Sequence, residues 1–307
     1  MARTHAKKTV TKDPSFRKKK PLTYLPTQRR IPIVNDEAPT AFTGQIDYAR
    51  LASQVNHRLY RYGKMYSLKV DMDPSEVVSG TKLHVFALAN NWAVQRAFEE
   101  AKVVFDRAYT DERENLSKTQ YARWRDFRIL SGLSGAIMNP VMDNAPESAP
   151  FNPITAGEFD NSVVEDSNGV ARNFTWSITP NSAQYSVINE YNLAANTTTN
   201  PTTPTGAGPY DDLEADASQV EMEALQQRGN LPPYNATNLP PVWIKVATLF
   251  VGSTGVQKLS TGYFDAPCGI VSLRLEGQNF LSMEDSLYVT AQSGDYKGVK
   301  AHNMERM

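Results

Sequence analysis

Short runs of β-branched and aromatic residues recur along this chain, and they constrain its fold more than any other feature. Such residues favour strands because their side chains pack well on a pleated surface. Proline, serine and glycine at 74–80 separate the first two runs, as expected of a connection between strands. The runs occupy residues 65–72, 82–88, 123–129, 174–178, 185–188, 242–251, 269–275 and 286–290.

Helical periodicity is strong in one long segment, residues 91–117. Its apolar residues recur at spacings of three and four, at Val94, Ala97, Phe98, Ala101, Val104, Phe105 and Ala108. Asn90 or Asn91 is a candidate N-cap. A second, shorter helical pattern runs through 46–58. Many strands with one long helix predict an all-β fold, an antiparallel sandwich or jelly roll with one amphipathic helix in an early connection.

Two segments are expected to be long surface loops. Residues 139–169 are rich in proline, asparagine, aspartate and glycine, and residues 192–241 carry threonine, proline and an acidic stretch at 211–223. Loops of this length are uncommon in compact domains, so these segments are either surface features with a role or disordered insertions. The acidic stretch lacks the spacing of a calcium loop, which favours a solvated surface over a cation site.

The first thirty residues are strongly basic. They carry ten basic residues against the single acid Asp13, a net charge of +9 in a chain of net charge −1. Few large apolar side chains and three prolines leave too little surface to bury, so residues 1–40 are expected to form a disordered arm and residues 41–307 the folded domain.

Flexible cations can neutralise phosphates without reading bases, which makes the arm a candidate nucleic-acid-binding segment. A solubilising tail is the alternative, and Arg17–Lys20 also fits a nuclear-import patch. The candidate binding residues of the arm are Arg3, Lys7, Lys8, Lys12, Arg17, Lys18, Lys19, Lys20, Arg29 and Arg30.

A second basic cluster, at 123–128, interleaves arginine with aromatic residues. If the segment is a strand, Arg123, Arg125 and Phe127 share one face, and Trp124, Asp126 and Arg128 share the other. Arg123 and Arg125 are therefore candidates for clamping nucleic acid. The alternative is an Arg–Asp ion pair beside a core aromatic residue.

Catalytic chemistry finds little support in the sequence. The four histidines share no metal-ligand spacing, no nucleophile or phosphate-binding motif is present, and His84 is expected to be structural. Cys268 is the single cysteine, so it is expected to be a small buried hydrophobe rather than part of a disulfide framework. No apolar run reaches the length of a membrane span. We therefore expect no enzymatic activity, no cofactor and no membrane partner.

The layout of several strings is similar to that of a known family. The basic arm precedes 64–70 and 83–88, Asn91–Val94 opens the amphipathic helix, and Ala122–Arg128 and Phe264–Gly269 follow. Together they resemble the capsid proteins of small circular single-stranded DNA viruses that encode a replication protein. The match covers about residues 1–130 and 242–290 and contains no active-site motif. The arm departs from the most arginine-rich members in being rich in lysine.

The resemblance implies a single jelly roll with long surface loops, assembled into an icosahedral shell of identical subunits, about 60 in the smallest case. It implies that the arm faces a single-stranded DNA genome, and that the protein occurs in the virion and in the host nucleus during assembly. The alternative that the residues leave open is a non-capsid nucleic-acid-binding protein that uses the arm as a tether.

Overall fold

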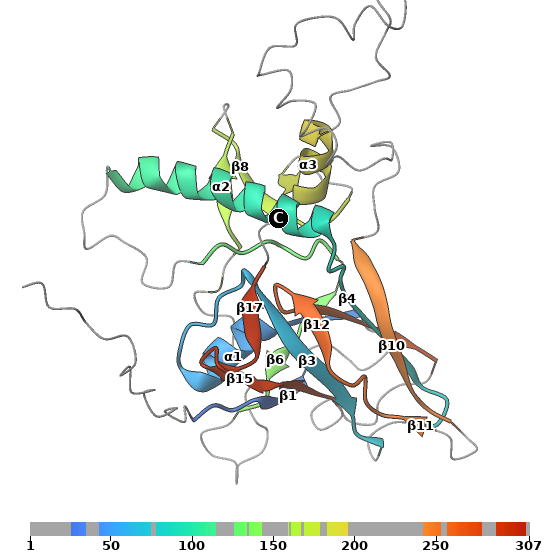
Figure 1. The fold of residues 1–307 in the computed structure, drawn as a ribbon. Coiled ribbons are helices and arrows are strands. Elements are labelled where there is room, and N and C mark those ends of the chain that lie inside the picture. Colours follow the sequence, from blue (N-terminus) through green and yellow to red (C-terminus); the bar gives the residue numbers. More distant parts are fainter. Residues whose placement is uncertain are drawn as a thin grey trace, which may run out of the picture.

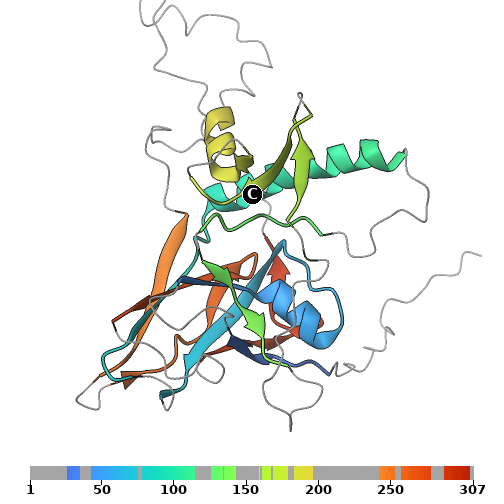
Figure 2. The same ribbon diagram turned by 180° about the vertical axis from the view of Figure 1, so that it is seen from behind.

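The protein folds into two packed, mostly antiparallel sheets with a helical layer across one end, in a computed structural model (Figures 1 and 2). Strands dominate, so the prediction of a mostly β chain is confirmed. The structure describes residues 26–34, 43–74, 78–114, 126–133, 135–142, 159, 161–166, 169–178, 183–195, 242–252, 257–277 and 287–304. The loop expected at 192–241 lies almost wholly outside this range, and so does the acidic stretch.

Each of the two sheets has six strands. The first contains β12 (Phe264–Pro267), β3 (Lys64–Met72), β14 (Leu287–Ala291), β1 (Arg30–Val34) and β6 (Asn139–Pro140) in this order, with β17 (Ala301–Asn303) also paired to β3. The second contains β11 (Gln257–Lys258), β10 (Trp243–Val251), β4 (Lys82–Leu88), β13 (Ile270–Glu276), β2 (Thr43–Asp47) and β5 (Ala136–Ile137).

The long pairings follow one rule. β1 pairs with β14, β2 with β13, β3 with β12, and β4 with β10, all antiparallel. The first long strand therefore lies beside the last, the second beside the next to last, and so on inward to the fourth and fifth. The chain crosses between the sheets at most of these steps.

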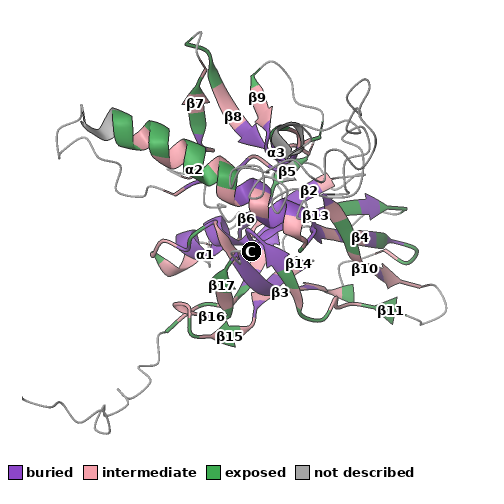
Figure 3. Cartoon of the chain, turned by 45° about the horizontal axis from the view of Figure 1, so that its top comes forward, coloured by how far each residue is buried: buried purple, intermediate pink, exposed green. Residues whose placement is uncertain are grey.

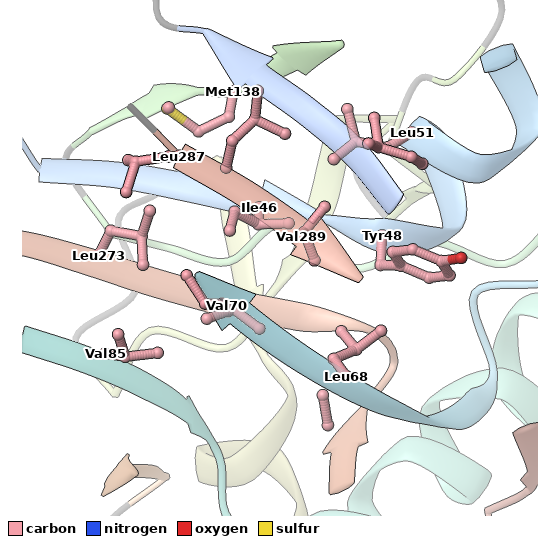
Figure 4. Packing of buried hydrophobic residues seen from close by; sticks show 14 of the residues in the cluster. Ile46, Tyr48, Leu51, Leu68, Val70, Val85, Met138, Leu273, Leu287 and Val289 are labelled. Carbon is pink, nitrogen blue, oxygen red and sulfur yellow. The ribbon is translucent and has the colours of Figure 1, made fainter. Parts of the chain in front are cut away.

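Alternating side chains from the two sheets form the interior, which we call the sandwich core. Leu68 and Val70 of β3 and Val289 of β14 point from the first sheet toward Val85 and Leu273 of the second (Figure 4). Its buried members are mostly aliphatic residues and tyrosines, each almost completely shielded from solvent. Burying such side chains stabilises the fold by about 1.5–3 kcal/mol each.

Helix α1 (Tyr48–Asn56) closes one end of the sandwich core with Tyr48 and Leu51 (Figure 4). The Asp47 carboxylate caps it by accepting the Arg50 N–H at 3.0 Å. The helix predicted at 46–58 is thus present, but its first two residues belong to β2, where pairing with β13 overrides the local pattern.

Helix α2 (Trp92–Glu114) confirms the helix predicted at 91–117. Asn91 is its cap, with Oδ1 accepting the Val94 N–H at 2.9 Å. Together with α3 (Val187–Ala195) and the small sheet β7 (Val163–Glu165), β8 (Ala171–Thr175) and β9 (Gln184–Ser186), it forms the layer across the sandwich (Figure 1).

Only the first half of α2 is buried. Ala93, Val94, Ala97 and Phe98 face the molecule, whereas Val104 is 51% exposed, although the predicted apolar stripe includes it. Residues in the distal half of α2 are exposed or only partly buried, as Figure 3 shows.

Aromatic rings gather beneath the buried half of α2 in a second interior, which we call the α2 core. Phe127 lies at its centre, with ring centroids 5.6 Å from Phe98 and 5.2 Å from Phe174. Trp176 is completely buried, and its indole N–H donates to the Tyr62 hydroxyl at 3.1 Å. Cys268 is fully buried here too, as predicted, and burial raises the pKa of its thiol.

Several sequence predictions need correction. Residues 126–129 are not a strand, and residues 185–188 divide between β9 and the start of α3. Residues 30–34 form β1 between β14 and β6, so the folded domain begins before residue 41. The sequence did not indicate this strand, because proline rarely lies inside a sheet and Pro32 follows the basic residues Arg29 and Arg30. Part of the loop expected at 139–169 also forms short strands, β6 and β7.

Among the described helices, none combines the length and apolar character needed to cross a membrane.

Candidate nucleic-acid interface

Most of the predicted binding residues lie outside the described part of the chain. This holds for Arg3, Lys7, Lys8, Lys12, Arg17, Lys18, Lys19, Lys20, Arg123 and Arg125. Arg29 and Arg30 are described, and they stand where the arm joins the folded domain. The Arg30 guanidinium lies over the Tyr288 ring, 4.1 Å from its centroid.

The arm is fixed to the domain at residues 27 and 28. The Thr27 hydroxyl donates to the Lys297 carbonyl at 2.9 Å, and the Gln28 N–H donates to Asn56 Oδ1 at 2.7 Å. A Cβ at Gly298 would stand 2.2 Å from Thr27 Oγ1, so the close approach requires glycine there. Thr27 and Gln28 therefore lie between the end of α1 and the turn joining β15 (Ser293–Gly294) to β16 (Gly298–Val299).

Four basic residues lie beside this junction, and we call them the basic platform: Arg58, Arg61, Lys64 and Lys297. Lys64 and Lys297 lie over the Tyr296 ring, the Arg61 backbone N–H donates to the Tyr296 hydroxyl at 3.0 Å, and the charge of Arg58 acts on both Tyr60 and Lys297. Burial lowers the pKa of the Lys297 ammonium, and the charges of Arg61, Arg58 and Lys64 lower it further. Like charges this close raise one another's energy in the charged form. An anion bound among them would relieve that repulsion.

A tyrosine lies among these cations. The Lys64 and Lys297 ammonium groups are 4.2 and 5.5 Å from the centroid of the Tyr296 ring. Tyr60 packs edge-on against Tyr296 at 6.0 Å, and its hydroxyl donates to the Lys297 carbonyl at 2.9 Å. Cations held over an aromatic ring keep a fixed position with their charge accessible.

Two residues at the edges of the platform have positive φ angles, each for a local reason. His57, with a φ of 50°, is the C-cap of α1, a position where left-handed backbone is common and which histidine tolerates. Lys297, with a φ of 51°, and Gly298 form the tight turn between Tyr296 and Val299, in which both central residues need a positive φ. These two turns set the path of the chain at the edges of the platform.

A buried ion network lies behind Arg61. The Asp126 side chain is only 9% exposed, accepts the Tyr62 N–H at 2.7 Å and stands 3.7 Å from the Arg61 guanidinium. Arg128 pairs with Asp47 and lies 3.9 Å from Asp126. Burial raises the pKa of Asp126 to about 6 and lowers the pKa of Arg128 to about 10.

Two interpretations of residues 123–128 were left open above: a nucleic-acid clamp, or an Arg–Asp ion pair beside a core aromatic residue. For residues 126–128, which the structure describes, the ion pair is found. Asp126 and Arg128 form ion pairs beside Phe127, as in the structural interpretation of the cluster. The alternation expected of a strand is wrong here, because Phe127 and Arg128 are both buried. The binding role predicted for Arg123 and Arg125 stays a prediction.

Sequence reasoning missed the basic platform. Its signal is visible in retrospect, since Arg58, Arg61 and Lys64 recur every third residue with Tyr60 and Tyr62 between them. Cations interleaved with aromatic residues are typical of single-strand binding surfaces. Lys297 has no such signal, because only the fold brings it to the other three.

His84 lies on the outer surface of the second sheet. Its Nδ1 is 3.0 Å from Thr248 Oγ1, and its Nε2 is 2.6 Å from Glu276 Oε2. These contacts link β4 to β10 and β13, as expected of a structural histidine. The described ranges contain no group of three acidic, histidine or cysteine residues positioned to hold a metal ion.

Comparisons of the chain with protein-family models, with curated proteins and with solved structures gave no match. The interface is therefore argued from its own geometry.

Proposed function

We propose that this protein is the shell subunit of a virus particle and that it encloses single-stranded DNA, which its basic arm contacts. The strand pairing supports the jelly-roll part of this proposal. Pairing of first with last and second with next to last, in two sheets of antiparallel strands, is the order of a rolled-up hairpin. Jelly rolls of this kind build viral capsids, but also lectins and cupins.

Because a fold does not fix a function, the interface carries the argument. The single observation is the place where the arm joins the domain. Thr27 is bonded to the turn that contains Lys297, so the +9 arm emerges beside the cations of the platform. Residues 31–307 have a net charge of −10, the total of −1 less the +9 of residues 1–30. Positive charge is thus gathered toward one end, as a subunit needs when one face meets a polyanion.

The test is whether the purified full-length protein forms particles that contain nucleic acid. We expect closed shells by electron microscopy, and co-purifying nucleic acid that DNase digests only after the shells are opened. Deleting residues 1–25 should remove most of this nucleic acid, because the deletion removes eight of the ten basic residues of the arm. A protein that stays monomeric at every salt concentration but binds nucleic acid through residues 1–25 would instead be a tethered binder.

Protease digestion tests the orientation of the subunit in the shell. We expect cleavage of intact particles within 192–241 and protection of residues 1–30, since the proposal places the arm inside. Loss of the arm first from intact particles would contradict it. Occurrence in the virion and, during assembly, in the host nucleus belongs to the same proposal.

A further inference from the structure

We infer that the basic platform of Arg58, Arg61, Lys64 and Lys297 is a second binding site, which holds the phosphate backbone of a single-stranded nucleic acid independently of the arm. The inference rests on the proposed function, because it names the contact that the folded domain itself makes with the enclosed strand.

The charge balance of the platform supports an anionic ligand. Arg61 is paired with Asp126, but among the described residues Arg58, Lys64 and Lys297 form no ion pair with a carboxylate. The Lys64 ammonium lies over the Tyr296 ring and donates to Asn303 Oδ1 at 2.7 Å, and the Lys297 ammonium lies over the same ring and donates to the Leu59 carbonyl. Phosphate oxygens accept strong, charge-assisted hydrogen bonds from arginine and lysine side chains.

An adjoining recess favours a single strand over a duplex. Arg61 and Lys64 also line a cavity of about 510 Å³ between α2 and the start of β3, together with Lys102, Thr110, Asn303, the rings of Phe98 and Phe127 and the carboxylates of Asp106 and Asp126. This volume lies in the range of ~300–1,000 Å³ typical of small-ligand sites. An unpaired base next to a bound phosphate can enter the recess. A base in a duplex would first have to leave its stack, at a cost of a few kcal/mol.

Lysine footprinting on the full-length protein tests the site directly. A short oligothymidylate should protect Lys64 and Lys297 from acylation, as measured by mass spectrometry of peptides. Lys245 and Lys258, on β10 and β11 of the second sheet, are exposed and should stay reactive. Equal labelling of Lys64 and Lys297 with and without the oligonucleotide would overturn the inference. Equal protection by a duplex at the same concentration would overturn its single-strand part.

A matched pair of double variants measures the contribution to binding. Arg58→Gln with Lys297→Asn removes two platform charges, and asparagine tolerates the positive φ at 297. Arg274→Gln with Lys258→Asn removes two exposed charges of the second sheet. The slope of log affinity against log salt should become shallower by about 0.7 per lost phosphate contact, roughly 1.4 for the platform variant. The control variant should keep the parent slope, and equal slopes for both variants would contradict the inference. The footprint of the parent protein decides the matter if the platform variant fails to fold.

The failure of this inference is distinguishable from failure of the proposed function. Shells that package DNA without protecting Lys64 and Lys297 would overturn the platform alone. Protection of both lysines in a protein that never assembles would keep the platform and overturn the shell proposal.

Discussion

The sandwich core and the α2 core differ in the side chains that form them and in the elements that contribute those side chains. In the sandwich core, residues such as Leu68, Val85 and Leu273 alternate along strands and meet their counterparts from the facing sheet. In the α2 core, rings from α2, β8 and the segment at 126–129 pack around Phe127, next to the buried charges of Asp126 and Arg128. The ionisable groups buried in the first interior are tyrosines such as Tyr48 and Tyr66, whose pKa burial raises, so we expect this core to be insensitive to pH in the neutral and acidic range. The second interior lies beside Asp126, whose pKa burial raises to about 6, so we expect its stability to depend on pH.

The largest effect is expected from Phe98→Ala in the α2 core. Phe98 is 4% exposed and contacts the Phe127 ring, so truncation removes transfer energy and leaves a cavity, a loss of about 3–5 kcal/mol in the free energy of unfolding. Chemical denaturation measures it, with Leu68→Ala as the counterpart in the sandwich core. Since β4 and β13 contribute residues to both cores, each variant should unfold in one transition. Two separate transitions would mean that the cores are independent units.

A pH-dependent effect is expected from Asp126. Burial raises its pKa to about 6, from a usual value near 4, so the folded state binds the proton more tightly than the unfolded state does. The corresponding stability is fully present below about pH 4 and is lost as the pH rises through 6, a change of about 3 kcal/mol. Unfolding at intervals between pH 4 and 7 measures this slope.

Asp126→Asn should remove this dependence while leaving the Tyr62 N–H an acceptor. Asp71→Asn, which alters an ion pair with Lys69 in the first sheet, should keep it. If the parent and Asp126→Asn give the same profile, the two cores do not differ in their response to pH.

A smaller effect is expected from Gly63→Ala. A Cβ at this position would lie 2.7 Å from Phe98 Cζ, and the overpacking should cost about 1–3 kcal/mol. Phe98→Leu shortens the opposing side chain, so the double variant should lose less than the sum of the two single variants. A double-mutant cycle measures the coupling between the two positions. If the two losses in the free energy of unfolding simply add, the strain of Gly63→Ala does not arise from Phe98.

The smallest effect is expected at the distal half of α2. Val104 is 51% exposed, so Val104→Ala should change the free energy of unfolding by less than about 0.5 kcal/mol. Thermal denaturation alongside Phe98→Ala, one of the other apolar positions of the same helix, provides the comparison. A loss as large as that of Phe98→Ala would show that the distal half is buried in solution.

Local pattern was sufficient for the long elements. The runs at 65–72, 82–88 and 242–251 coincide closely with β3, β4 and β10, and the helix at 91–117 with α2. The hydrophobic pattern within each of these segments is enough to predict its type of secondary structure. β1 and β2 lacked this signal, because Pro32, Gly44 and Gln45 become strand residues only through pairing with β14 and β13.

The sequence by itself determined the composition of the molecule: a basic arm, a mostly β domain, one long helix and a buried Cys268. Only the tertiary structure decided which strands pair, which half of α2 is buried and which cations meet. The basic platform illustrates the reason. Tyr60 bonds to Lys297 across 237 residues of chain. Periodicity in the sequence reflects only the local structure of residues that are close along the chain. A site made from residues so far apart forms only when the strands pair into sheets.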